Sequence, residues 1–209
     1  LHFDATYEPV IAGSTLYYGS SRNDSVTAVD LVTGKDRWRF FTDGPVRFAP
    51  VLFAGKIYFG ADDGSLYCLT ADNGDLVWRF RAAPNDRHVI GNERLISVWP
   101  VRGGPVLVDN QIHFTAGVWP FEGTFLYAVD AATGQLVDSK PTTESPRHDV
   151  VTLNDMTPQG YLAANDARVF IPQGRPVVGS RNRRTGGFET FQYSTSAVTN
   201  YHVATTGQW

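Results

Sequence analysis

The chain has 209 residues, a formal net charge of -3, a pI near 5.9 and one cysteine. This charge gives no electrostatic reason to expect a nucleic-acid partner, and one cysteine excludes an intrachain disulfide, a cysteine-rich metal site and a CxxCH haem attachment. No apolar run approaches the roughly 18 residues of a membrane-spanning helix. The first four residues do not resemble a signal peptide, so no targeting segment is visible.

The first predicted group of strands covers residues 7–46. It opens with YEPVIAGSTLYYGS, in which short apolar and aromatic runs are bounded by glycine and polar residues. It continues with AVDLVTGKDRWRF, where Thr33-Gly34 is typical of a tight turn because glycine reaches positive φ without steric cost. Short runs without a 3.6-residue period predict β-strands rather than helices.

A second group, residues 47–80, repeats the first. FAPVLFAGKIYFGA places Pro50 41 residues after Pro9, and CLTADNGDLVWRF places Gly74 40 residues after Gly34. A period of about 40 residues is that of one four-stranded propeller blade. The repeat therefore predicts consecutive blades.

Two weaker groups follow at residues 101–140 and 158–192. The third carries AVDAATGQLVD, with Gly134 in the turn, and the fourth carries NRRTGGFET. Insertions at residues 81–103 and 118–124 separate or interrupt these groups. Residues 1–209 are therefore expected to form one domain, with the regular repeat in its first half.

Together these features predict an all-β fold, a partial β-propeller of four-stranded antiparallel blades. One blade cannot bury both of its faces, so neighbouring blades must stack to hide their apolar surface. About four blades are recognisable, and we expect them to belong to a ring of seven or eight. A compact small propeller is the alternative, because propellers of four blades exist.

The segment from Ala28 to Trp38 fits the pattern AxDxxTGxxxW and resembles the PQQ-like β-propeller repeats, which quinoprotein alcohol dehydrogenases share with the outer-membrane barrel-assembly lipoprotein. The resemblance implies that each Trp packs against the turn of a neighbouring blade and donates its ring N–H to a backbone acceptor. Asp138 and Thr190 replace the third and fourth Trp, so we expect the contacts between neighbouring blades to be packed differently at those two positions. The docking positions that the resemblance implies are Ala28, Asp30, Gly34, Trp38, Gly74, Trp78 and Gly134.

The quinoprotein members of this family imply PQQ and calcium as cofactors. In them PQQ lies over the propeller centre between a Trp and two adjacent cysteines, and calcium is held by Glu, Asn and Asp. This chain has no adjacent cysteines and no matching calcium ligands, so we expect no cofactor and no metal within it. Asp62-Asp63 and Asn154-Asp155 are the nearest acidic pairs, and their neighbours favour turns. The resemblance also implies a periplasmic or extracellular location.

Arg47 and Arg102 occupy equivalent places, because VRFAP and VRGGP align without a gap. The place is just before the innermost strand, which in a propeller enters beside the central channel. Two arginines there can bind a small anionic ligand through a carboxylate or phosphate. Alternatively, they brace the channel by bonding backbone carbonyls and a buried aspartate. Both readings stay open at this point.

The insertion at residues 81–103 is a second candidate for ligand binding. Loops added to a propeller face usually shape its binding surface. This one brings Arg87, His88 and Arg94 together with Trp99. We therefore include its two arginines and its histidine among the candidate ligand-binding residues.

Two further polar features favour structural explanations. His113 takes the position of Tyr17 and Tyr58 in earlier repeats, which favours a histidine packed within a strand. A basic group near the fourth turn is explained by solvated charge, with a docking patch as the alternative. Its members are Arg175, Arg181, Arg183 and Arg184.

Three classes of function remain open. The preferred one is a non-catalytic binding or scaffolding propeller, whose partner is another protein or the remaining blades; under it, this chain alone is not an enzyme. The second is part of a PQQ-dependent alcohol or sugar dehydrogenase with its catalytic residues in other blades. The third is a lyase or hydrolase using the channel-mouth arginines and loop acids. No catalytic residue can be named from the sequence, and fold alone does not choose between these classes.

Overall fold

The chain forms two compact units, Leu1–Arg102 and Gly103–Trp209. Apart from one 3-10 turn, η1 (Pro120–Glu122), the residues described by the computed structural model are strands, turns and loops without a helix. η1 lies inside the predicted insertion at 118–124. The described residues are 8–91, 94–137, 151–152, 157–173 and 177–192.

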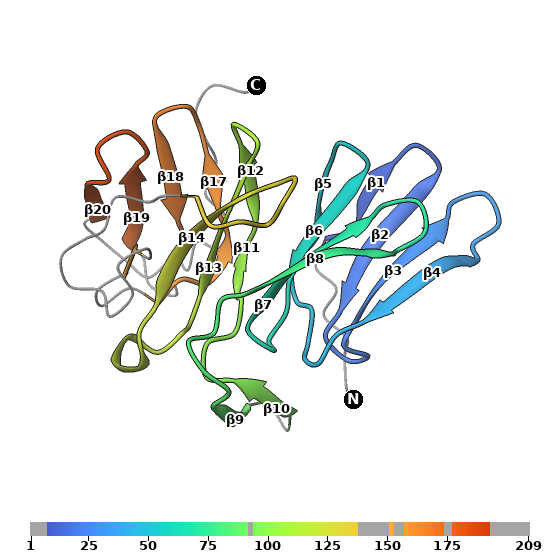
Figure 1. Ribbon diagram of the computed structural model, residues 1–209, viewed down its shortest axis with the longest axis horizontal. Helices are drawn as coiled ribbons and strands as arrows, with labels where there is room; N and C mark the ends of the chain where they lie inside the picture. Colours follow the sequence, from blue (N-terminus) through green and yellow to red (C-terminus); the bar gives the residue numbers. More distant parts are fainter. Residues whose placement is uncertain (1–7, 92–93, 138–150, 153–156, 174–176, 193–209) are drawn as a thin grey trace. The chain divides into compact units, whose positions relative to one another are not determined.

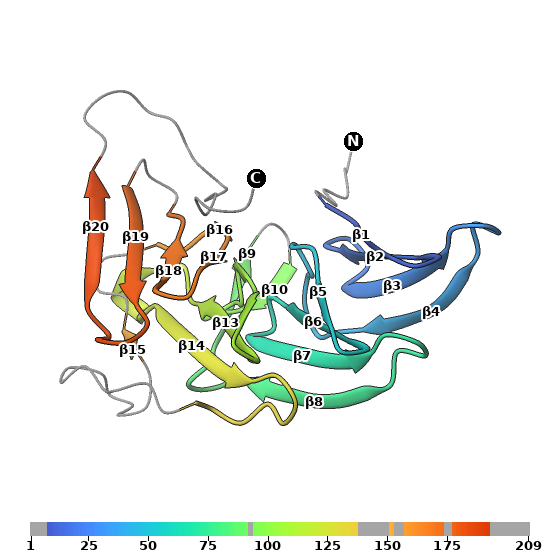
Figure 2. The same cartoon turned by 90° about the horizontal axis from the view of Figure 1, so that it is seen from above.

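Unit 1 contains two four-stranded antiparallel sheets and one hairpin. Figures 1 and 2 show that each sheet runs in chain order, so that every strand pairs with the next one. The first sheet consists of β1 (Val10–Ala12), β2 (Thr15–Ser20), β3 (Ser25–Asp30) and β4 (Asp36–Phe41). The second consists of β5 (Val51–Phe53), β6 (Lys56–Gly60), β7 (Ser65–Thr70) and β8 (Leu76–Arg81). The hairpin, within the insertion, pairs β9 (His88–Gly91) with β10 (Arg94–Ser97).

Unit 2 also contains two four-stranded antiparallel sheets. One consists of β12 (Val106–Val108), β13 (Gln111–Ala116), β14 (Phe125–Asp130) and β15 (Val151–Thr152). The other consists of β17 (Ala163–Ala164), β18 (Arg168–Ile171), β19 (Val177–Asn182) and β20 (Phe188–Gln192). A short parallel pair joins β11 (Gly103–Gly104) to β16 (Gly160–Tyr161). The all-β prediction is confirmed, but β15 carries its sheet past residue 140, where the sequence repeat ended the third group.

The repeated turn is built from local hydrogen bonds. Gly34 has a φ of 68°, and its N–H donates to the Asp30 carbonyl at 2.8 Å. The Asp30 carboxylate accepts from the N–H groups of Val32 and Thr33 and from Arg37. The Thr33 N–H, with help from Arg37, lowers the pKa of Asp30 to about 2. The turn between β14 and the following segment is built in the same way, which explains the recurring Asp and Gly of the motif.

The two sheets of unit 1 pack face to face around a shared core. Close approach depends on glycine at two equivalent points: a Cβ on Gly19 would lie 2.6 Å from Val46 Cγ1, and one on Gly60 would lie 2.3 Å from Val101 Cγ1. The segment that follows each sheet therefore crosses it at close range and places the next residue, an arginine, beside the sheet. The buried core residues are Tyr17, Val26, Ala28, Val46, Ile57, Phe59, Ala61, Tyr67 and Leu69.

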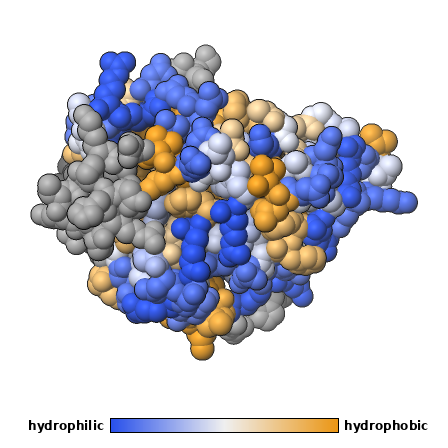
Figure 3. Space-filling model, viewed as in Figure 1, coloured by the Kyte–Doolittle hydropathy of each residue, from blue (hydrophilic) through white to orange (hydrophobic). Residues whose placement is uncertain are grey.

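The surface mixes residue types. On the face drawn in Figure 3, hydrophobic residues are interspersed with hydrophilic ones. Among the described residues, no helix has the length and apolar character needed to cross a membrane. Two strongly exposed apolar residues, Ile90 and Leu95, are direct cross-strand partners in the β9–β10 hairpin.

Candidate functional site

Arg47 and Arg102 meet at the same carboxylate. Arg47 donates from Nε to Asp62 Oδ2 at 2.7 Å. Arg102 donates from Nε to Asp62 Oδ1 at 3.1 Å and from Nη2 to Oδ2 at 2.8 Å. The Asp62 side chain is 1% exposed, whereas the two arginine side chains keep 24% and 20% of their surface. The structure therefore joins two sequence candidates through a buried acid, as the bracing interpretation required.

Backbone contacts fix Asp62 in the turn between β6 and β7. The Asp62 N–H donates to the Pro45 carbonyl at 2.8 Å, and the Asp62 carbonyl accepts from the Ser97 N–H at 2.8 Å. Gly44 allows the first of these segments to come close, since a Cβ there would lie 2.7 Å from the Asp63 N. The chain before β5 and the end of the insertion thus both hold this turn.

Two cations share one anion in this cluster. Within the described chain, both Nη atoms of Arg47 and Nη1 of Arg102 have no hydrogen-bond partner. Guanidinium groups recognise carboxylates and phosphates through such paired N–H donors. The cluster therefore keeps donors for a small anion even though Asp62 braces it, and anion binding here stays a prediction.

The arginines of the insertion also have partners within unit 1. Arg94 donates from Nη1 to the Arg22 carbonyl at 3.0 Å and forms an ion pair with Asp24. Burial raises the pKa of Asp24, and the positive charge of Arg94 opposes that rise. The Arg87 guanidinium lies 5.6 Å from the centre of the Trp99 ring, a cation–π contact. Arg94 therefore ties the insertion to the first sheet, whereas the Arg87 contact lies within the insertion.

The hairpin itself presents a different surface. His88, which pairs with Ser97, is exposed. Ile90 and Leu95, the next cross-strand pair on the same face, are 78% and 63% exposed. Apolar side chains on a fixed loop suit recognition of another protein surface. Sequence reasoning selected His88 by its chemistry and missed these two apolar neighbours.

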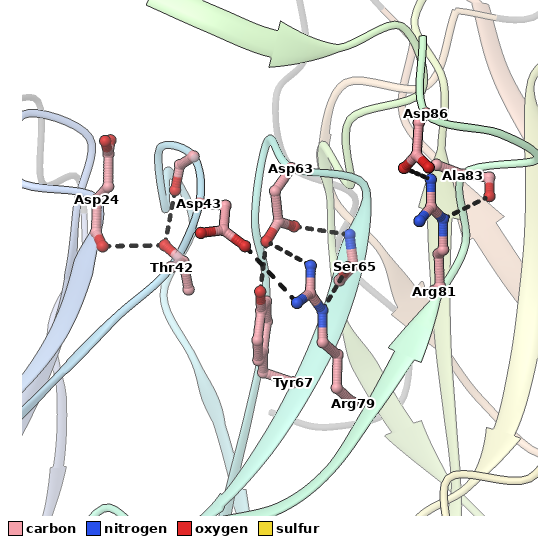
Figure 4. Close-up of polar contacts among 11 residues, drawn as sticks. Asp24, Thr42, Asp43, Asp63, Ser65, Tyr67, Arg79, Arg81, Ala83 and Asp86 are labelled. Carbon is pink, nitrogen blue, oxygen red and sulfur yellow. Dashed lines mark hydrogen bonds and ion pairs between the residues drawn. The ribbon is translucent and has the colours of Figure 1, made fainter. Parts of the chain in front are cut away.

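Asp63 organises a second polar cluster, shown in Figure 4. Its carboxylate accepts from Tyr67 Oη, from Arg79 Nη2 at 3.2 Å and from the Ser65 N–H at 2.9 Å. Arg79 also lies over the Tyr67 ring, 5.1 Å from its centre. Burial raises the pKa of both Asp63 and Tyr67. Sequence reasoning read Asp62-Asp63 only as a turn, and nothing local in the sequence indicated these partners.

The described residues do not fit PQQ and calcium as the quinoprotein members bind them. No group of three or more His, Cys, Asp or Glu in this part of the chain could hold a metal ion. The lone thiol, Cys68, is fully buried in β7, and burial raises its pKa to about 11. Asn154-Asp155, Asp138 and Arg175 lie outside the described residues.

The family model described as outer membrane protein assembly factor BamB matches residues 2–208. The chain belongs to this BamB family. Over 140 residues it is 29% identical to the dehydrogenase subunit of alcohol dehydrogenase (quinone) from Gluconobacter oxydans, covering 61% of this chain and 18% of the relative. It is 23% identical to quinohemoprotein alcohol dehydrogenase ADH-IIG from Pseudomonas putida, covering 75% and 26%. The chain thus spans about a fifth of the length of the first of these relatives.

Solved structures show the same fold as this BamB-family chain. Quinohemoprotein alcohol dehydrogenase from Comamonas testosteroni has a TM-score of 0.65 at 17% identity, over 88% of this chain and 34% of that one. BamB from Moraxella catarrhalis has a TM-score of 0.56 at 19% identity, over 94% and 66%. At these identities the likeness concerns the fold alone. The propeller prediction is confirmed, and the number of blades stays a prediction.

His113 is a buried polar residue of unit 2. It is 4% exposed in β13, and neither ring nitrogen has a hydrogen-bond partner among the described residues. Burial, together with the positive charges of Arg183 and Arg181, lowers its pKa to about 4. The imidazole is therefore neutral at pH 7, packed in its strand as the sequence indicated.

We expect His113 to make the protein less stable in acid. Between pH 6.5 and about 4 the unfolded chain binds a proton at this histidine and the folded chain does not. The free energy of unfolding should therefore fall by roughly 3 kcal/mol as the pH is lowered through this window, with no further loss below it. Urea unfolding in chloride buffers should show this pH slope in the wild type and not in His113→Phe, since Phe170 occupies the equivalent position in β18. Equal slopes in the two proteins would refute the assignment.

Proposed function

We propose that this chain is a non-catalytic binding module, a section of a PQQ-like propeller that presents the β9–β10 hairpin to a protein partner. The observation that carries the proposal is the exposed pair Ile90 and Leu95 on a hairpin whose base is anchored. An apolar pair at the tip of an inserted loop contributes nothing to the core of its own unit. It is therefore better explained by a partner.

Anchoring of the hairpin supports this function energetically. Arg94 is tied to the first sheet, and the Ser97 N–H is tied to the Asp62 carbonyl. Within the insertion, the Val98 N–H donates to the Arg87 carbonyl at 3.0 Å. A loop fixed before binding loses little conformational entropy when a partner arrives, which favours affinity. The spare donors of Arg47 and Arg102 offer a second, anion-binding surface on the same unit.

The proposal also includes the wider architecture. We take the four sheets as successive blades, at about residues 7–46, 47–80, 101–140 with its later strand, and 158–192, within a ring of seven or eight. Family membership supports a periplasmic or extracellular location. The number of blades in the ring and the location are both proposals about the whole protein, since the match covers only 18% of the relative from Gluconobacter oxydans.

Site-specific photocrosslinking tests the binding function. A photoreactive amino acid at position 90 of the full-length protein is expected to give one adduct of defined mass in cells. The matched control is position 32, because Val32 is 86% exposed on the turn after β3 and belongs to no proposed surface. Leu95→Glu should abolish the adduct at position 90. Adducts of equal yield at both positions, or none at position 90, would contradict the proposal.

A section of a PQQ-dependent alcohol dehydrogenase is the second candidate, and the names of the curated relatives favour it. Its test is the full-length protein mixed with PQQ and calcium, followed by absorbance and by dye reduction with alcohols. Under our proposal we expect neither binding of one PQQ per chain nor reduction of the dye when alcohol is added. Their appearance would select the second candidate. The lyase or hydrolase class has no comparable support, since both of its arginines pair with Asp62.

A further inference from the structure

Strand register identifies which residues of the two units occupy corresponding positions. His113 pairs with Val106 as Tyr17 pairs with Val10, so the imidazole stands where the first sheet has a phenol. These residues lie on the face that packs against the next sheet within each unit. We call the contact between the two four-stranded sheets of a unit its seam. The seams of unit 1 and unit 2 can therefore be compared position by position.

The seam of unit 1 satisfies its own polar groups. Tyr17 donates from Oη to the Ala71 carbonyl at 3.1 Å, and Trp38 donates from Nε1 to the same carbonyl at 2.9 Å. Leu69, opposite them in β7, is fully buried. No charge is enclosed between these residues.

The seam of unit 2 carries ionisable groups at the same positions. Arg181 pairs with Val169 as Leu69 pairs with Ile57, so a guanidinium replaces an aliphatic side chain. Arg183 stands three residues before the turn glycine, the position of Ala71 in unit 1. The two sheets meet in a core that includes Leu126, Leu162, Val169 and Ile171.

Each of these groups has at least one buried nitrogen without a hydrogen-bond partner in the described chain. Arg181 is 9% exposed and makes no ion pair or hydrogen bond there, and its Nε is buried. Arg183 uses Nη2 on Asp109 at 2.6 Å and Nη1 on two backbone carbonyls, while its buried Nε stays unpaired. Both ring nitrogens of His113 are unpaired as well. A Cβ on Gly186 would lie 3.6 Å from Arg181 Nη2, whereas one on Gly74 would lie 2.7 Å from the Trp38 ring.

We propose that this seam of unit 2 binds a small oxyanion between Arg181, the Nε of Arg183 and His113. A buried guanidinium without a counter-charge is costly. Water can complete hydrogen bonds, but only an anion also neutralises Arg181. Oxyanions match the geometry of guanidinium donors, and a neutral imidazole adds one N–H donor.

Calorimetric titration of the full-length protein with sodium phosphate, at constant ionic strength in chloride, tests the site. We expect one phosphate per chain. Arg181→Gln should weaken binding roughly tenfold or more, since it removes hydrogen bonds from a charged donor. The matched control Arg184→Gln removes the same charge from an exposed position in the neighbouring turn and should change affinity less than about twofold. If Arg181→Gln does not fold, Arg181→Leu restores the residue type of unit 1 and should fold without responding to phosphate.

The same titration of Asp138→Asn distinguishes a site for a free anion from a site that is filled by a carboxylate of the chain itself. Asp138, outside the described residues, occupies in sequence the place of Trp38 and is the candidate tested. Phosphate binding that appears only in Asp138→Asn would show that a carboxylate of the chain occupies the seam in the wild type, and would overturn the proposal of a bound free oxyanion. Absence of phosphate binding in both the wild type and Asp138→Asn would overturn the proposal. Neither outcome depends on the hairpin, so the binding function of unit 1 is tested separately.

Discussion

Asp62→Ala is expected to lower the free energy of unfolding by about 3 to 5 kcal/mol, the range for breaking a buried ion pair from one side. The carboxylate is 1% exposed and accepts from both Arg47 and Arg102. Its removal leaves two largely buried guanidinium groups facing each other without a counter-charge. Urea unfolding at neutral pH followed by tryptophan fluorescence measures the change.

Asp43→Ala is the matched control for Asp62→Ala, because Asp43 is 80% exposed and its contact with Arg79 is long, at 3.7 Å. Its effect should stay within about 0.5 kcal/mol. If Arg47→Gln and Arg102→Gln are each combined with Asp62→Ala, part of the loss should be recovered, since fewer charges are then left unpaired. A loss below about 1 kcal/mol for Asp62→Ala would mean that the arginines do not depend on it.

Trp38→Ala is expected to cost about 3 to 4 kcal/mol, the lower part of the range for removal of a buried aromatic residue. The indole is half-buried, packs against the unit 1 core and donates to the Ala71 carbonyl at 2.9 Å. Phe41→Ala, in the same strand, removes a ring that is 65% exposed and should have little effect. Similar losses from the two variants in urea unfolding would show that Trp38 does not join the sheets.

Two glycines give an independent check on the Trp38 contact. Gly34 and Gly74 occupy equivalent turns with φ of 68° and 75°, so alanine strains both backbones alike. Only at Gly74 would the added Cβ also meet the Trp38 ring, at 2.7 Å, since nothing lies within 4 Å of the same atom at Gly34. Gly74→Ala should therefore destabilise the protein by about 1 to 3 kcal/mol more than Gly34→Ala. Equal losses of unfolding free energy in the two variants would show that the Trp38 ring does not lie against Gly74 in solution.

Features set by neighbouring residues could be predicted from the sequence. The Asp30 to Gly34 turn closes through hydrogen bonds within five residues. The backbone bond of its glycine recurs in the other three turns, although Thr70 and Asn182 replace the aspartate in two of them. The alignment of Arg47 with Arg102 also followed from the repeat. The position of Trp38 against the next turn followed from resemblance to a known family, and its contact with Ala71 agrees with it.

Features set by distant residues could not be predicted. Asp62 lies 15 residues from Arg47 and 40 from Arg102, and no periodic pattern singles it out from Asp63. The β9–β10 hairpin was expected only as an insertion, because His88–Gly91 and Arg94–Ser97 are too short to show a clear alternation. The unpaired state of His113 depends on the opposing sheet, which sequence alone does not specify.

The insertion leaves and rejoins the second sheet of unit 1 at one turn, residues 61–64 between β6 and β7. At its start the N–H groups of Ala82 and Ala83 donate to the Gly64 carbonyl at 2.9 and 3.1 Å, and at its end Val101 N–H donates to the Ala61 carbonyl at 3.1 Å. Both ends of the insertion are thus fixed by backbone hydrogen bonds, which do not depend on the side chains between them. Since the entropy of closing a loop grows only slowly with its length, this turn is a natural acceptor for grafted hairpins of other lengths and sequences, and specificity can change there without redesign of the blade.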